Sequence, residues 1–208
     1  MKNRRSGFTL MELMAVVAIM ATLAALTMVG FRHAQTTASR NRTAAFHRAI
    51  ISGLEAYNND FGEFPTPKNP MEMSNFAGRS IVSGGAAMLY QALSGDGNDQ
   101  IVLGTSGATQ SNGEVSAQEV QFVKMTDMPR EMVMQAGESW VLIDGFNRPF
   151  QYTKGPDKAR PGQAQSAPET MNPTYDLWSF AESDNFPNNV GLSEKRDTKL
   201  SAKWIKNW

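Results

Sequence analysis

Residues 8–30 read FTLMELMAVVAIMATLAALTMVG, an apolar run whose single charged side chain is Glu12. At about 1.5 Å per residue, a helix of this length spans the roughly 30 Å of a bilayer's hydrocarbon core. The basic residues that precede the run are Lys2, Arg4 and Arg5. By the positive-inside rule, these charges keep residues 1–7 in the cytoplasm and send the rest of the chain outward. The sequence therefore predicts one N-terminal membrane helix.

Three interpretations of this segment compete. A secretory signal peptide has a shorter apolar run with a small-residue cleavage site after it, and residues 8–30 fit this pattern poorly. A plain uncleaved anchor explains the length of the run but not Glu12. A charged side chain at the bilayer centre costs about 2.5–3.5 kcal/mol on insertion scales, so Glu12 needs a partner. The third interpretation supplies that partner.

The string RSGFTLME at residues 5–12 closely resembles the processing motif of type IV prepilins and type II secretion pseudopilins. The resemblance implies that a membrane peptidase cuts between Gly7 and Phe8 and that the new amino terminus at Phe8 is N-methylated. It also implies that Glu12 pairs with this amino group on a neighbouring subunit. An opposite charge at that place would offset the cost of burying the carboxylate.

Helical periodicity continues beyond the membrane segment. Apolar residues recur every three or four positions and form one stripe on a helix: Phe46, Ile50, Leu54, Tyr57 and Phe61. Gly62 and Pro65 predict the end of this helix. We expect a leader at 1–7, a transmembrane and filament-core helix at 8–30, and a periplasmic head at 31–208 that includes the amphipathic half of the long helix.

The remainder of the chain has the pattern of an α+β head. Residues 84–94 predict a short second helix. The strand-like runs are 140–143, 149–153 and 175–180. Residues 101–139 have the composition of an insertion with one short strand at 120–125, and the tail with Trp204 and Trp208 is predicted to cap the sheet. The expected fold is pilin-like: a long N-terminal α-helix packed on a small antiparallel β-sheet head.

Several segments of this head are similar to the major pseudopilin of type II secretion, the general secretion pathway protein G type. The family turn Asp-Pro-Trp-Gly-Asn-Pro-Tyr-x-Tyr appears here as DGFNRPFQY at residues 144–152. The other matching segments, in the family's order, are 57–65, 175–179 and 205–208. Residues 101–139 and 155–174 have no counterpart.

In that family a loop after the last long strand binds calcium through aspartate and backbone oxygens, the ligand type that this hard cation requires. The corresponding loop here is AESDN at residues 181–185. The resemblance implies a Ca²⁺ site whose candidate ligands are Ser183, Asp184, Asn185 and Asp197. The alternative is a solvated polar loop held by turn hydrogen bonds.

Composition excludes several other functions. The chain of 208 residues has no cysteine, so disulfides, zinc–thiolate sites and thiol nucleophiles are excluded. Without the three leader charges, 17 basic side chains face 20 acidic ones, and nucleic acid is not an expected partner. His33 and His47 are too far apart to share a metal, and no nucleophile elbow or phosphate loop occurs. We therefore expect a structural protein and not an enzyme.

The main hypothesis from the sequence is a pseudopilin, a structural filament subunit of a type II secretion-like system. The implied partners are copies of itself, other pseudopilins, the prepilin peptidase, and an inner-membrane assembly platform with its ATPase. The expected location is the bacterial inner membrane, single-pass, with a cytoplasmic N-terminus and a periplasmic head. The alternatives are a type IV pilin for adhesion, motility or DNA uptake, and a membrane-anchored periplasmic enzyme or binding protein.

Overall fold

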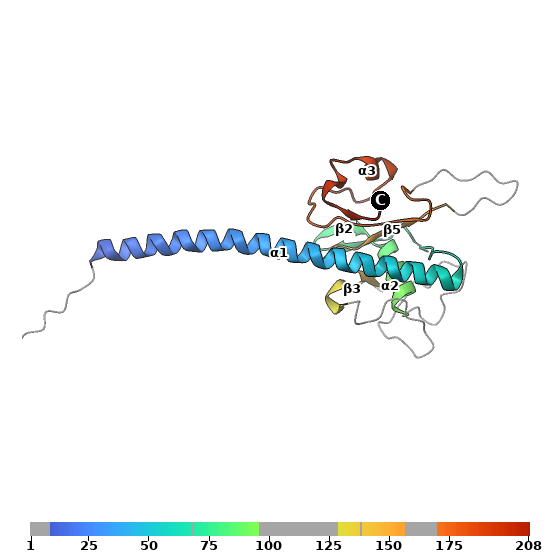
Figure 1. The fold of residues 1–208 in the computed structure, drawn as a ribbon, viewed down its shortest axis with the longest axis horizontal. Helices are drawn as coiled ribbons and strands as arrows, with labels where there is room; N and C mark the ends of the chain where they lie inside the picture. The colour runs from blue at the N-terminus through green and yellow to red at the C-terminus, as the bar shows by residue number, and fades with distance from the viewer. Residues whose placement is uncertain (1–8, 68, 96–128, 138, 157–169) are drawn as a thin grey trace, which may run out of the picture. The chain divides into compact units, whose positions relative to one another are not determined.

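The computed structural model describes residues 9–67, 69–95, 129–137, 139–156 and 170–208 (Figure 1). The chain divides into two compact units, residues 1–38 and residues 39–208. Its fold is α+β and pilin-like, as predicted: a long N-terminal helix is followed by small antiparallel sheets. The predicted strand at 120–125 lies outside the described residues.

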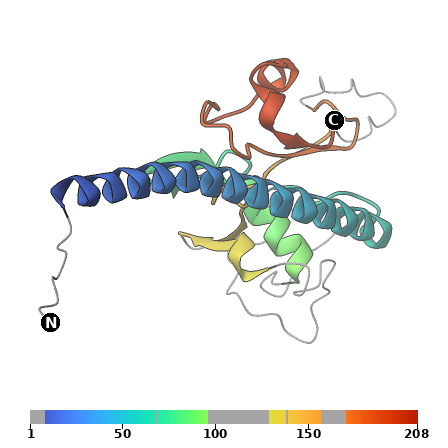
Figure 2. The same cartoon turned by 60° about the vertical axis from the view of Figure 1, so that its left-hand side comes forward.

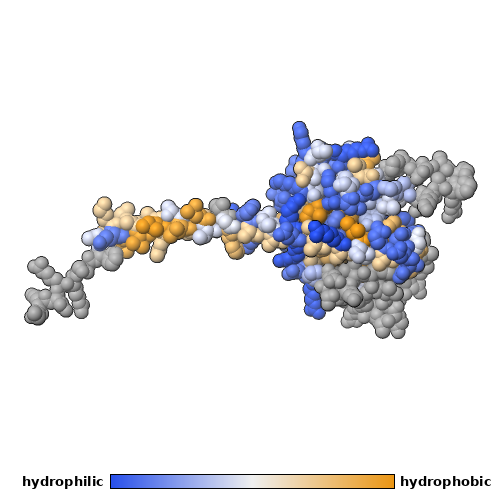
Figure 3. Space-filling model, viewed as in Figure 1, coloured by the Kyte–Doolittle hydropathy of each residue, from blue (hydrophilic) through white to orange (hydrophobic). Residues whose placement is uncertain are grey.

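Helix α1, Leu10–Phe61, runs without interruption for 52 residues, which confirms the single long helix predicted from the sequence. In the first unit its described side chains are exposed, and apolar residues cover much of the face of the helix that Figure 3 shows. Within residues 10–28, every residue other than Glu12, Thr22 and Thr27 is apolar, so the apolar surface continues around the helix. Among the described residues, α1 is the one helix long and apolar enough to cross a membrane. A helix that is apolar all round and not covered by protein is typical of a membrane span.

In the second unit, the predicted apolar stripe of α1 forms part of the core. Phe46, Ile50, Leu54 and Tyr57 are between 0% and 4% exposed. The first three pack in one cluster with residues of α2 and of the strands β4, β5 and β6, among them Leu89, Leu142 and Leu177. Full burial of a large apolar side chain contributes about 1.5–3 kcal/mol each, so this stripe fixes residues 39–61 onto the head.

The head contains three small antiparallel sheets. The first two are hairpins: β1 (Met73–Phe76) with β2 (Arg79–Val82), and β3 (Val133–Ala136) with β4 (Ser139–Leu142). The third sheet has the order β5-β6-β7, in which the strands are β5 (Gln151–Lys154), β6 (Tyr175–Ser179) and β7 (Ile205–Lys206). Its register places Thr153 opposite Asp176 and Ser179 opposite Ile205.

Strand β6 is covered on both faces, and all five of its residues are buried. Tyr175 and Leu177 belong to the cluster that includes the α1 stripe. Trp178 belongs to a second core cluster. Trp204 and Trp208 of the C-terminal segment pack in the same cluster. The ring centroids of Trp178 and Trp208 are 5.6 Å apart. The predicted capping of the sheet by the aromatic tail is therefore confirmed.

The remaining helices are short. They are α2 (Gly84–Ser94), α3 (Leu192–Arg196) and the 3₁₀ turns η1 (Arg130–Met132) and η2 (Ser201–Lys203). Helix α2 has the predicted bounds. It lies very close to β5, since a Cβ on Gly85 would stand 2.7 Å from the Tyr152 carbonyl oxygen. Figures 1 and 2 show α2 and β3 on one side of α1 residues 39–61, and the C-terminal segment with α3 on the other.

Three predicted strands are confirmed within two residues at each end, as β4, β5 and β6. The hairpin of β1 and β2, the strand β3 and the helix α3 were not predicted. The residues of its turn explain why the β1–β2 hairpin was missed. The two turn positions with positive φ are Ala77 (φ 53°) and Gly78 (φ 84°). Such turns ordinarily use Asn-Gly or Asp-Gly, so the alanine concealed the turn.

Candidate functional site

Glu12 lies in the first turn of α1, where it forms a reciprocal pair of hydrogen bonds with Thr9. The Thr9 N–H and the Thr9 hydroxyl each donate to Glu12 Oε2 at 2.9 Å. In return, the Glu12 N–H donates to Thr9 Oγ1 at 3.3 Å. This arrangement is a capping box, and it satisfies backbone donors that have no carbonyl partner at a helix start.

The capping box uses one oxygen of the Glu12 carboxylate. Among the hydrogen bonds of the described residues, none goes to Glu12 Oε1. An ionised carboxylate can accept several hydrogen bonds on its two oxygens. Thr9 therefore fixes the side chain while Oε1 stays free to accept a donor from another molecule.

The other two residues of the predicted processing site, Gly7 and Phe8, lie outside the described residues. Cleavage between them and methylation of the Phe8 amino group therefore stay predictions. Thr9 follows Phe8 directly in the sequence. The free oxygen of Glu12 thus belongs to a side chain four residues along the chain from the predicted new amino terminus.

The polar side chains of residues 9–30 all have partners within the helix. Besides the pair at its start, the Thr22 hydroxyl donates to the Ile19 carbonyl at 2.8 Å, and the Thr27 hydroxyl donates to the Ala24 carbonyl at 2.9 Å. Hydrocarbon offers no hydrogen-bond partners, so polar groups in a membrane must be satisfied internally. This segment meets that requirement.

The four predicted calcium ligands belong to two separate turns. Asp197 Oδ1 accepts hydrogen bonds from the backbone N–H groups of Lys199 and Leu200, at 2.8 and 3.2 Å, and so caps its own turn. Ser183 donates to the Asn185 carbonyl within the other turn, at 3.2 Å. Among the described residues, no group of three or more acidic, histidine or cysteine side chains is placed to hold a metal ion.

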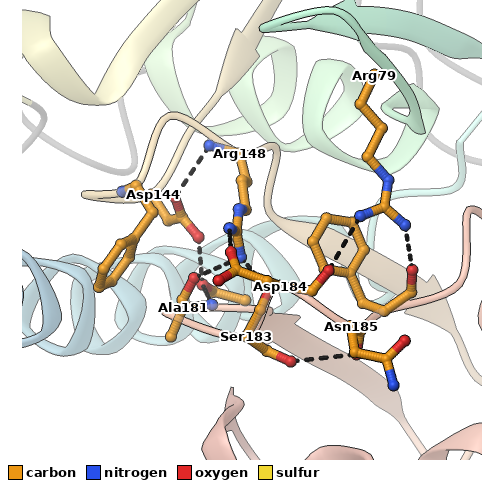
Figure 4. Close-up of polar contacts among 10 residues, drawn as sticks. Arg79, Asp144, Arg148, Ala181, Ser183, Asp184 and Asn185 are labelled. Atoms are coloured by element: carbon orange, nitrogen blue, oxygen red, sulfur yellow. Dashed lines mark hydrogen bonds and ion pairs between the residues drawn. The ribbon is translucent and has the colours of Figure 1, made fainter.

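The loop after β6 is instead contacted by Arg148, which sequence reasoning did not single out. Its Nη1 donates to the carbonyl oxygens of Ala181, at 2.8 Å, and of Ser183 (Figure 4). Its Nη2 forms an ion pair with Asp184 Oδ1 at 2.8 Å. The signal in the sequence was that Arg148 stands at the asparagine position of the family turn quoted above.

Asp144 holds the turn that carries Arg148. It is fully buried, and its Oδ1 accepts the backbone N–H groups of Phe146 (2.8 Å) and Arg148 (3.0 Å). Its Oδ2 accepts the Ser179 hydroxyl at 2.6 Å, and Ser179 Oγ in turn accepts the Ala181 N–H at 2.9 Å. Burial raises the pKa of Asp144, although the bonds from Ser179, Arg148 and Phe146 oppose the change.

The two histidines occupy different environments on α1. His33 is exposed in the first unit. His47 is buried in the head, where its Nε2 lies 3.1 Å from the Leu177 carbonyl oxygen. A carbonyl only accepts hydrogen bonds, so Nε2 carries the proton and donates. Burial lowers the pKa of His47, and the neutral ring acts as a packing residue.

Residues 2–28 match the family model described as the prokaryotic N-terminal methylation motif. This motif indicates the type IV pilin-like class, whose members are processed by a prepilin peptidase and assemble into filaments. Together with the long apolar helix, the match fits a membrane-anchored protein. No curated protein and no solved structure matches the chain significantly.

Proposed function

We propose that this pilin-like chain is a pseudopilin, a structural filament subunit of a type II secretion-like system and not an enzyme. The observation that carries the proposal is the carboxylate of Glu12 at the start of the apolar helix, inside the matched motif. One oxygen is fixed by Thr9 and the other is free among the described contacts. A second subunit can offer its positive amino terminus to that oxygen.

The apolar part of α1 supplies the second requirement, a surface for assembly. Its large side chains are 45–82% exposed: Leu10, Met11, Leu13, Met14, Val16, Val17, Ile19, Met20, Leu23, Leu26, Met28 and Phe31. In the bilayer these groups contact lipid. In a filament, contacts between helices would replace the lipid contacts, and pairing of Glu12 with the next subunit's amino terminus would set the stagger. A charge-assisted bond of this kind contributes about 1.5–3 kcal/mol.

The head supports the secretion assignment over a pilus. The segments that resemble the protein G type are 144–152 and 175–179, and they lie together in the fold. The Ser179 hydroxyl donates to Asp144 at 2.6 Å, and β5 pairs with β6 along four residues. The chain also has no cysteine and therefore no C-terminal disulfide. The partners we propose are other pseudopilins, the prepilin peptidase, and the assembly platform with its ATPase.

The orientation in the membrane follows from the charges. Lys2, Arg4 and Arg5 precede the apolar helix, so by the positive-inside rule the N-terminus is cytoplasmic and the head periplasmic. Cleavage by the peptidase removes these charges, so the processed helix can leave the bilayer more easily.

The test is the variant Glu12→Gln, expressed in place of the wild-type protein. Glutamine keeps the side-chain shape and an oxygen acceptor for Thr9, but it removes the negative charge. We expect the amount of assembled filament to fall at least about tenfold, because one charge-assisted bond is lost. The amount of the protein in the membrane is expected to stay the same. Glu131→Gln is the matched control, because Glu131 is an exposed acid of the head whose side chain is 60% exposed.

Normal filaments from Glu12→Gln would contradict the proposed role of the carboxylate. Deletion of the gene separates the two filament systems. Loss of exported proteins with intact surface pili supports a secretion pseudopilin, and loss of pili with normal export supports a type IV pilin. A deletion strain with normal export and normal pili would favour a membrane-anchored protein of another kind.

A further inference from the structure

The loop of residues 181–188 presents backbone oxygens to two guanidinium groups. Arg148 donates to the carbonyls of Ala181 and Ser183, as described above. Arg79 donates to the carbonyls of Asp184, at 3.3 Å, and of Phe186 (Figure 4). Four carbonyl groups of one short loop thus point at two permanent positive charges, because arginine stays protonated in proteins.

The two arginines also share one aromatic ring. The Arg79 guanidinium carbon lies 3.9 Å from the centroid of Phe186, and that of Arg148 lies 4.9 Å from it. Phe186 in turn stacks on Phe180, with centroids 4.1 Å apart. Because Phe180 and Phe186 belong to the second core cluster, these cation–π contacts anchor the two guanidinium groups and the loop to the core.

The position of Arg148 is itself fixed by buried groups. Its backbone N–H is held by Asp144, which is 0% exposed. Asn147 just before it adopts a left-handed conformation (φ 58°) that asparagine tolerates better than most residues. The side chain of Arg148 is only 18% exposed. The guanidinium is thus a built part of the head and not a solvated surface charge.

The same oxygens are the kind of ligand that a calcium ion would need at this loop. The Arg148 guanidinium stands against the carbonyls of Ala181 and Ser183 and against Asp184 Oδ1. A divalent cation beside it would meet a like charge and would have to displace these hydrogen bonds. Asp197, the fourth predicted ligand, is engaged in its own turn. The residues present therefore do not fit the ion.

We propose that Arg148, with Arg79, takes the place of a metal ion in the loop of residues 181–188, so that the loop is ordered without calcium. These contacts all lie within the head and are independent of the proposed function. Its consequence is that chelators leave the head intact, whereas loss of one guanidinium opens the loop.

The experiment is limited proteolysis of the full-length chain in detergent micelles. Mass spectrometry measures the rate of cleavage within residues 181–188. The wild-type protein is digested in about 5 mM CaCl₂ and in EGTA. We expect cleavage rates that agree within about twofold. A calcium site with a Kd of about 10⁻⁴ M would slow cleavage about fiftyfold at this concentration, and that result would overturn the proposal.

The variant Arg148→Met removes the guanidinium but keeps a long apolar stem. We expect cleavage in the loop to accelerate at least about tenfold in both solutions, since bonds to a charged donor are lost. Arg130→Met, a change at an exposed arginine of η1, is the control and is expected to leave the rate unchanged. An unchanged rate in Arg148→Met would also overturn the proposal.

Two further variants keep the proposal testable if Arg148→Met fails to fold, as judged by circular dichroism. Arg148→Lys retains the charge but lacks the planar fork that reaches two carbonyls, and it is expected to be cleaved faster than the wild type. Arg79→Met removes the other guanidinium and is expected to open the loop in the same way. Wild-type rates in both variants would show that neither guanidinium holds the loop.

Discussion

The Thr9 N–H lies 2.9 Å from Glu12 Oε2, and the Glu12 N–H returns a bond to Thr9 Oγ1. The carboxylate at the start of α1 is therefore oriented by its own helix before any other subunit approaches. Pre-orientation lowers the entropic cost of forming a bond to a partner. Thr9 is thus a positioning residue for the group that we propose to set the stagger of the filament.

This relationship predicts a graded effect of substitutions at Thr9. Thr9→Ala removes the hydroxyl and the cap, which costs about 1 kcal/mol, so the fraction of assembled protein is expected to fall about fivefold. Thr9→Ser keeps the hydroxyl and should assemble as the wild type does. Filament yield after shearing, measured by immunoblot against the membrane fraction, checks this. Equal yields from the Ala and Ser variants would contradict a positioning role.

A single substitution in α3 is expected to cause a large loss of stability, because it breaks a buried ion pair. Lys195 Nζ lies 2.9 Å from Asp176 Oδ2, and the two side chains are 1% and 0% exposed. Asp176 also accepts the backbone N–H groups of Met171 and Asn172. Lys195→Met leaves the carboxylate buried without its counter-charge and is expected to reduce the free energy of unfolding by about 3–5 kcal/mol.

Denaturant unfolding of the full-length chain in micelles measures this effect. The double variant Lys195→Met with Asp176→Asn removes both charges and should recover much of the loss, because it leaves no uncompensated ion. A double variant less stable than Lys195→Met alone would contradict this account of the pair.

Because of the buried carboxyl group of Asp144, we expect the stability of the head to depend on pH. Burial raises its pKa above the ordinary value of 3.8. The folded state then binds the proton more tightly than the unfolded state, so Asp144 contributes stability that is present at low pH and lost as pH rises through the folded-state pKa. Asp144→Asn removes this contribution. We expect its stability relative to the wild type to increase from about pH 4 to about pH 7, as measured by thermal unfolding.

His47 is expected to make the stability of the head depend on pH in the opposite direction. Burial lowers its pKa below 6.5, against the effect of the Leu177 carbonyl, and the nearby Arg48 lowers it further. The unfolded state therefore binds the proton more tightly, and stability is lost as pH falls below 6.5 toward the folded-state pKa. His47→Gln keeps a donor for the carbonyl and should lose less stability on acidification. Parallel urea titrations at about pH 7.5 and 5.5 test this, and identical losses in both proteins would contradict it.

The sequence predicted those parts of the molecule whose signal is local. The unbroken apolar run, the motif around Glu12 and the stripe from Phe46 to Phe61 each lie within a few helical turns, and α1 follows from them. Strands β4 and β6 were predictable because apolar and aromatic residues are concentrated in them. Strand β5 was predictable because it follows the turn at residues 144–148. Both faces of β6 are buried, and three of its five residues are the large side chains Tyr175, Leu177 and Trp178.

The parts that were missed depend on contacts between distant residues. Arg148 meets the loop 33–36 positions later, and two of its partners are backbone carbonyls that no side-chain pattern reveals. Likewise, nothing in the sequence pairs Lys195 with Asp176, whose side chains meet only in the folded head, where α3 lies against β6. Strand β3 lies at the end of a segment with no periodicity, and its pairing with β4 becomes evident only in the folded head.

The measurement that tests the central claim most directly is intact and peptide mass spectrometry of the protein isolated from its native membranes. A pilin-like filament subunit is predicted to begin at Phe8 and to carry one added methyl group on its amino nitrogen. A chain that retains residues 1–7, or that is cut at another position, would contradict prepilin processing and the assembly role proposed for Glu12.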